Sequence, residues 1–204
     1  MTPYTLPASR FCELVVNHNN LSEQGFLQWA FYPGMLFQSR ERWWDNGGFR
    51  DKPHEGIDLC LYNDQSGSTR ALDTAAPIPV MYRGCVKNII DDYIGKTIFM
   101  AHDIYNDTVK QLYSIYGHVE RLGRIESGVI LEEGEIAGSI AGTEGKRLKI
   151  LPHVHISVAL IPESFPAEQL SWKIMNESLD IILLNPLDIF NGNYTILQQN
   201  LQSF

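Results

Sequence analysis

The chain has 204 residues, of which 44% are hydrophobic, 11% aromatic and 20% charged. This length predicts one domain with extensions or two small domains, and the abundance of apolar residues excludes a chain that is disordered throughout. Sixteen Lys and Arg against 24 Asp and Glu give a formal net charge of −8. That charge argues against a nucleic-acid partner, because nucleic-acid-binding proteins usually present a basic face.

Membrane and secretion signals are weak. The longest apolar runs, such as residues 181–184, are far shorter than the roughly 18 residues that a transmembrane helix needs. Three cysteines with no Cys-x-x-Cys pair do not indicate a disulfide framework. The first ten residues have neither the basic nor the apolar region of a secretory signal. Both a cytoplasmic location and a leader removed from a periplasmic or extracellular protein therefore stay open.

In chain order, Ser22 is predicted to cap a short helix over residues 20–29, inside an N-terminal extension at 1–36. From about residue 33 to 160, glycines separate short runs that are rich in β-branched and aromatic residues. Such runs predict a mainly β, antiparallel architecture. The predicted strands are 57–62, 78–81, 85–90, 97–101, 109–116, 129–131 and 153–160.

The C-terminal part differs in pattern. Residues 166–177 have the apolar spacing of an amphipathic helix, within an insertion at about 161–180. Residues 181–184 predict one more strand. The polar residues 191–204 are predicted to form a loosely held tail. Short helices are thus expected only in the N-terminal region and in the C-terminal insertion.

Two histidine patterns are candidates for chemistry. His54 and Asp58 form an H-x-x-x-D in which Pro53 and Gly56 disfavour a helix, so Asp58 is expected on a strand and His54 in the loop before it. His153 and His155 form an H-x-H at the start of a β-rich run. On a strand this spacing points both imidazoles to one face of the sheet.

Two imidazoles and one carboxylate are a ligand set suited to Zn²⁺ that leaves a fourth position for water. His54, Asp58 and one histidine of the H-x-H are the candidate set. The other histidine of the pair then lies within hydrogen-bond reach of the zinc-bound water, whose pKa zinc lowers from about 15.7 towards 7. The residues alone do not decide which of the two histidines binds the metal.

A family resemblance rests on three segments, which are His54-Glu-Gly-Ile-Asp58-Leu59, Tyr116-Gly117-His118-Val119 and Pro152-His153-Val154-His155. In this order they resemble the motifs of the lysostaphin-type (M23) zinc metallopeptidases, a family of peptidoglycan endopeptidases. The resemblance covers roughly residues 37 to 190 and implies the antiparallel sheet core of that family.

The resemblance also implies residue roles. It makes His54, Asp58 and His155 the zinc ligands and His118 and His153 the catalytic pair, which assists attack of a zinc-bound water on an amide carbonyl. The implied substrate is a peptidoglycan peptide, so the implied location is periplasmic or extracellular. Two alternatives remain at this stage, a wall-binding or regulatory module that does not cleave and a zinc peptidase that acts on another substrate.

Overall fold

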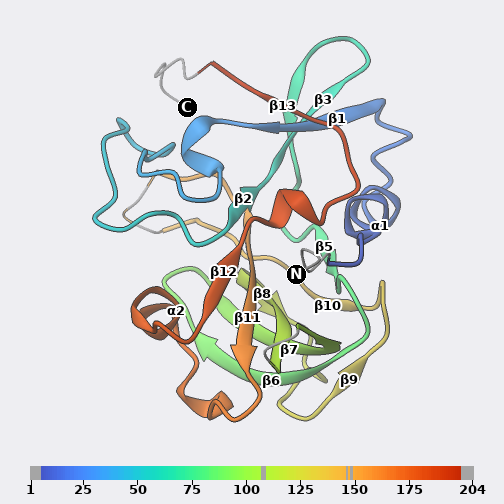
Figure 1. Ribbon diagram of the computed structural model, residues 1–204. Helices are drawn as coiled ribbons and strands as arrows, with labels where there is room; N and C mark the ends of the chain where they lie inside the picture. Colours follow the sequence, from blue (N-terminus) through green and yellow to red (C-terminus); the bar gives the residue numbers. More distant parts are fainter. Residues whose placement is uncertain (1–5, 107–108, 146, 148, 199–204) are drawn as a thin grey trace.

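Within residues 6–106, 109–145, 147 and 149–198, which the computed structural model describes, the strands form two sheets (Figure 1). The small sheet has the strand order β13-β1-β3-β4. Its members are β1 (Phe26–Phe31), β3 (Leu61–Asp64), β4 (Thr69–Ala71) and β13 (Tyr194–Ile196). Strand β13 runs parallel to β1, and the other neighbours in this sheet are antiparallel.

The large sheet is antiparallel and has the main order β12-β11-β8-β7-β6-β9, with β2 paired to β11 and β10 paired to β5 and β8. Its members are β2 (Ile57–Leu59), β5 (Pro77–Pro79), β6 (Gly84–Asp91), β7 (Lys96–Tyr105), β8 (Lys110–Arg121), β9 (Ile130–Leu131), β10 (Ile136–Ile140), β11 (Val154–Pro162) and β12 (Ile182–Leu184). The mainly β fold with an antiparallel core and few short helices is confirmed.

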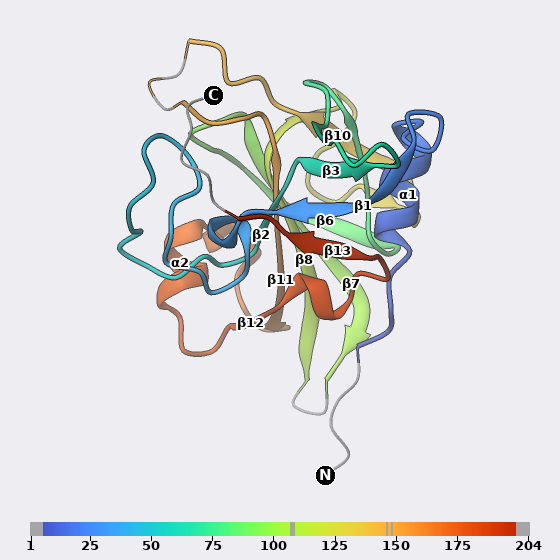
Figure 2. The same cartoon turned by 90° about the horizontal axis from the view of Figure 1, so that it is seen from above.

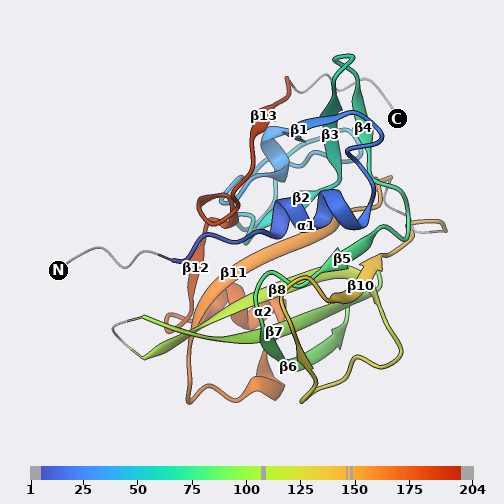
Figure 3. The same ribbon diagram turned by 90° about the vertical axis from the view of Figure 1, so that its right-hand side faces the viewer.

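Both faces of the large sheet are covered, because side chains alternate along each strand. In β7, Ile98 and Met100 join the main core, whereas Phe99 and Ala101 join a second apolar cluster on the opposite face. The main core lies beneath α1 (Phe11–His18), which Figure 3 shows between the two sheets. The second cluster lies beneath α2 (Trp172–Glu177).

The N-terminal helix is displaced from its predicted place, and the prediction of a helix over 20–29 is wrong. The helix is α1, at 11–18, and it is followed by turns that end at Gly25, whose φ is +78°. Strand β1 then begins at Phe26 and pairs with β3 (Figure 2). Tertiary pairing with β3 therefore overrides the local capping signal at Ser22.

The predicted C-terminal helix is interrupted. Residues 167–169 form the 3-10 turn η2 (Ala167–Gln169), and α2 starts only after Ser171, whose side chain accepts a hydrogen bond from the Ile174 amide. The strand predicted after this helix is confirmed as β12. Two further 3-10 turns are η1 (Pro33–Met35) and η3 (Pro186–Asp188).

Residues 194–196, inside the segment predicted as a tail, form β13. The first five residues of the predicted extension and the last six of the predicted tail lie outside the described part of the chain. In the part that is described, every helix is too short or too polar to cross a lipid bilayer.

Candidate metal centre

The pairing of β2 with β11 brings two of the predicted ligands together. His155 stands directly opposite Asp58 in this antiparallel pair, so their side chains project from the same face of the sheet. This is the face that α2 covers further along the strands, because His155 has the same parity in β11 as Ala159 and Ile161 of the second cluster.

Gly56 permits this close approach. A Cβ atom at Gly56 would lie 2.1 Å from the Ile156 carbonyl oxygen and 2.6 Å from Ser157 Oγ. No side chain fits into that space, so the glycine of the His54-to-Asp58 segment is needed for packing against β11.

The backbone of residues 36–39, directly after η1, holds His54 in its loop. Its backbone amide donates to the Ser39 carbonyl at 2.9 Å, and its carbonyl accepts from the Gln38 amide at 2.8 Å. Its ring Nδ1 lies 3.1 Å from the Leu36 carbonyl oxygen. A carbonyl can only accept, so Nδ1 carries a proton and Nε2 is the nitrogen available to a metal.

Three ligand atoms converge from these elements. His54 Nε2 lies 3.1 Å from Asp58 Oδ1 and 3.0 Å from His155 Nδ1, and the last two atoms are 3.0 Å apart. For a tetrahedral zinc ion with ligands at about 2.0–2.1 Å, neighbouring ligand atoms stand about 3.3 Å apart. The nearly equilateral triangle of His54, Asp58 and His155 is therefore close to one face of such a site, and this buried group can hold a metal ion.

The donor chemistry of the triangle also fits a cation. His155 Nε2 lies 2.9 Å from Ser157 Oγ, and when it donates there its Nδ1 is a lone pair. The carboxylate and two lone-pair nitrogens then face one another with no proton between them. Burial lowers the pKa of His155, which favours the neutral imidazole that a metal requires.

Asp58 is oriented through its other oxygen. Its Oδ2 accepts from Trp43 Nε1 at 2.6 Å and lies 3.3 Å from the Arg50 guanidinium. Burial opposes the charge on Asp58, but the nearby His54, His153 and His155 lower its pKa well below the usual range. Such contacts fix the direction in which a ligand points. Oδ1 is thereby left to face the triangle.

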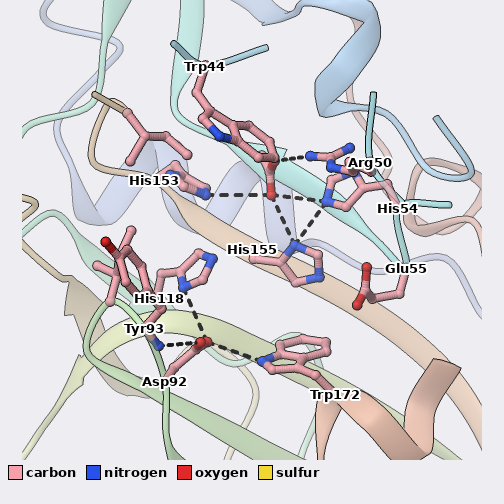
Figure 4. Close-up of a pocket in the computed structure, with 13 residues that line it drawn as sticks. Trp44, Arg50, His54, Glu55, Asp92, Tyr93, His118, His153, His155 and Trp172 are labelled. Carbon is pink, nitrogen blue, oxygen red and sulfur yellow. Dashed lines mark hydrogen bonds and ion pairs between the residues drawn. The ribbon is translucent and has the colours of Figure 1, made fainter. Parts of the chain in front are cut away.

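The two remaining predicted histidines lie beside the triangle (Figure 4). His153 donates from Nδ1 to the Leu151 carbonyl at 2.8 Å, and its Nε2 lies 3.6 Å from Asp58 Oδ1. The ring centroids of His118 and His153 are 4.8 Å apart, and those of His118 and His155 are 6.0 Å apart. All five predicted site residues thus meet in one place.

The surroundings of His153 and His118 shift their pKa values in opposite directions. Burial lowers the pKa of His153 to about 4. Burial also acts to lower the pKa of His118, but Asp92 outweighs it and the pKa is raised. His118 Nδ1 is 3.2 Å from Asp92 Oδ2, with the ring turned away from a straight hydrogen bond. His118 has a φ of +60°, a left-handed value that is uncommon for residues other than glycine, although histidine adopts it more often than most.

Asp92 and Trp172 contact the site histidines His118 and His155, and the sequence alone did not single them out. Asp92 Oδ2 accepts from Thr97 Oγ1 at 2.8 Å and from Trp172 Nε1 at 3.2 Å. The Trp172 ring lies edge-on to His155, with centroids 4.8 Å apart. A Cβ at Gly117, opposite His155 in β8, would lie 3.0 Å from the Trp172 ring. No motif marks Asp92 or Trp172, since they act through partners far away in the sequence.

The centre opens into a cavity of about 220 Å³. Its walls include Trp44 and Trp172, and the guanidinium of Arg50 lies 4.7 Å from the centre of the Trp44 ring. Trp43, by contrast, is buried in the main core. A second cavity of about 690 Å³ shares Trp44 and Ile150 with the first. The two cavities therefore adjoin at Trp44 and Ile150.

Neither a protein-family model nor a curated protein matches the chain. Among solved structures, it is similar to lysostaphin, determined by NMR in solution, with 22% identity and a TM-score of 0.39 over 58% of this chain. It is also similar to a candidate glycyl-glycine endopeptidase, LytM, from Ruminococcus gnavus, with 19% identity and a TM-score of 0.40 over 67% of this chain.

A third similar structure is a candidate M23 peptidase from Pseudomonas aeruginosa, with 18% identity and a TM-score of 0.43 over 87% of this chain. The chain spans 40%, 45% and 63% of the length of these three proteins, in the order given.

Proposed function

We propose that this chain is a zinc-dependent endopeptidase that hydrolyses amide bonds in peptidoglycan peptides. The observation that carries the proposal is the convergence of His54, Asp58 and His155 within one buried triangle that opens into a cavity. The choice of peptidoglycan rests on the order and content of the three sequence motifs. With such a substrate, the protein acts outside the cytoplasmic membrane.

In this proposal His54 Nε2, Asp58 Oδ1 and His155 Nδ1 hold the metal. A bound zinc ion supplies a Lewis acid that polarises the scissile carbonyl and lowers the pKa of water to about 7. The protein keeps the three ligand atoms in place through the Leu36 carbonyl, Ser157, and the Trp43–Arg50 pair on Asp58 Oδ2.

His153 and His118 divide the proton transfers between them. His153 is neutral and presents the lone pair of Nε2 to the centre, so it accepts a proton from the attacking water. The Asp92 carboxylate lies 3.2 Å from Nδ1 of His118, so this ring holds a proton more readily than His153 does. His118 therefore stabilises the oxyanion that forms on the carbonyl and donates a proton to the leaving amine.

The test measures zinc content and cleavage on the same samples. Purified protein should contain one zinc per chain and release new amino groups from peptidoglycan, and a chelator should abolish the release. His54→Ala, Asp58→Ala and His155→Ala should lose both metal and activity. His118→Ala and His153→Ala should keep the metal and lose most of the turnover, about 100-fold or more for a general acid or base. His18→Ala, at an exposed histidine, is the control.

Three outcomes would overturn parts of this proposal. Full zinc occupancy in all three ligand variants would refute the ligand set. Zinc-loaded protein that binds cell-wall material without cleaving it would indicate a binding module. Cleavage of other peptides but not of peptidoglycan would leave the chemistry intact and change the substrate.

A further inference from the structure

Glu55 is a carboxylate of the cavity wall that the Arg50 guanidinium attracts without forming a salt bridge. It lies in the loop between His54 and Gly56, is half-buried, and lines the same cavity as the metal triangle. Its Oε1 accepts from Asn176 Nδ2 of α2 at 2.7 Å. Figure 4 shows its side chain beside His155. No ion pair of Glu55 occurs among the residues that the structure describes.

The other carboxylates of this wall are already engaged. Asp58 belongs to the metal triangle and is held by Trp43 and Arg50. Asp92 faces His118 and also accepts from Thr97 and Trp172.

The neighbouring cations are engaged as well. Lys52 pairs with Glu177 at 2.9 Å, and the Arg50 guanidinium donates to the Gly34 carbonyl and contacts Asp58. Among the described residues, Glu55 thus accepts a hydrogen bond only from the neutral Asn176 amide, and Arg50 attracts it without a salt bridge.

This arrangement favours one kind of ligand group. A carboxylate offers two oxygens with about four acceptor positions, and the amide of Asn176 uses one of them. An ammonium group supplies three N–H donors and the opposite charge, and such charge-assisted hydrogen bonds are about twice as strong as neutral ones. Partial burial beside Trp172 strengthens the attraction further.

We propose that Glu55, held in place by Asn176, binds an amino group that the peptide substrate carries close to the scissile amide. This inference rests on the proposed peptidase function and narrows its substrates to amine-bearing peptides. The amino group can be a free α-amine or a side-chain amine, which have the same chemistry at this site.

The experiment compares four matched peptide substrates with zinc-loaded enzyme. One has both amines free, one is acetylated at the α-amine, one at the side-chain amine, and one at both. The Glu55→Gln variant keeps an oxygen that can accept from Asn176 and removes the charge. Glu168→Gln, at an exposed carboxylate of η2, makes the same change in net charge away from the cavity. The measured quantity is kcat/KM.

For the wild type and Glu168→Gln we expect acetylation of one particular amine to reduce kcat/KM about tenfold or more. Glu55→Gln should cleave the free substrate about tenfold more slowly and show no further loss on acetylation, because the two changes remove the same interaction. The identity of the sensitive amine tells the two sources apart.

Equal acetylation effects in wild type and Glu55→Gln, or no acetylation effect in either, would refute the amine site while leaving the peptidase function in place. A wild type that cleaves none of the four peptides, nor peptidoglycan, would refute the proposed function and this inference with it.

Discussion

The carboxylate of Asp92 links His118 to helix α2. It lies 3.2 Å from His118 Nδ1 and accepts from Trp172 and Thr97. We expect Asp92→Asn to keep full zinc content, since Asp92 is outside the metal triangle. Its kcat should fall about 10- to 100-fold, the usual effect of removing the partner of a site histidine.

The neighbouring residue supplies a control for this prediction. Asp91 is exposed and pairs with Lys96 at the surface, and exposed ion pairs contribute little to stability. Asp91→Asn should therefore behave as wild type in zinc analysis and steady-state kinetics. A kcat for Asp92→Asn equal to that of Asp91→Asn would show that Asp92 does not position His118.

Side chains of the centre were predictable where they sit in short local patterns. His54 and Asp58, or His153 and His155, are close in the sequence, and period-two geometry already puts the latter pair on one face. Asp92 could not be found in this way. Read by itself, Asp91-Asp92 is indistinguishable from a solvated turn, and its role arises from contact with His118 and Trp172.

Among the elements, the pairing of β2 with β11 is what sets Asp58 opposite His155. Gly56→Ala should disrupt it, because the added Cβ would meet backbone atoms of β11 at 2.1 Å and backbone cannot yield as a side chain does. We expect a loss of unfolding free energy of about 1–3 kcal/mol, as for overpacked cores, together with weaker zinc binding. Urea unfolding and a competitive zinc titration measure the two effects.

Gly123→Ala is the matched control for this substitution. Nothing lies within 4 Å of a Cβ built at Gly123, so this change should leave stability within about 0.5 kcal/mol of wild type. If Gly56→Ala were equally neutral, the segment before β2 would not lie as close to β11 as described. The pairing that places Asp58 opposite His155 would then be wrong.

Long strands with β-branched or aromatic runs were predictable, whereas very short, exposed strands were not. Strand β7 carries the apolar run 97–101 in a sheet with two buried faces. Strands β4 and β13 have three residues each and are largely exposed, so neither is long enough to show the alternation of a half-buried strand. Strand β1 follows a local pattern that suggests a helix, and only its pairing with β3 makes it extended. The position of α2 over the metal centre likewise depends on tertiary contacts.

At the scale of the whole molecule, stability should depend on pH through a histidine remote from the metal triangle. His102 of β7 is buried, with Nδ1 donating to the Arg83 carbonyl at 3.0 Å and Nε2 lying 2.8 Å from Ser114 Oγ. Ser114 Oγ is 3.0 Å from Tyr116 Oη, which accepts from the Met81 amide. This chain of hydrogen bonds connects the large sheet to the segment after β5.

Burial lowers the pKa of His102 from 6.5 to about 4. Between these values the unfolded chain binds a proton that the folded protein does not, so stability is lost as pH falls from about 6.5 to 4. The lowered pKa corresponds to about 3 kcal/mol. Between pH 7 and pH 4, the unfolding free energy of His102→Gln should therefore fall by about 3 kcal/mol less than that of the wild type.

The measurement is urea unfolding at both pH values, with a chelator present so that metal release does not contribute. Other buried histidines, including His153, act equally in wild type and variant, and their effect cancels in the difference. His18→Gln, at an exposed position, should retain the full wild-type acid sensitivity. If His102→Gln retained it too, His102 would have to be protonated without cost inside the folded protein, which its burial opposes.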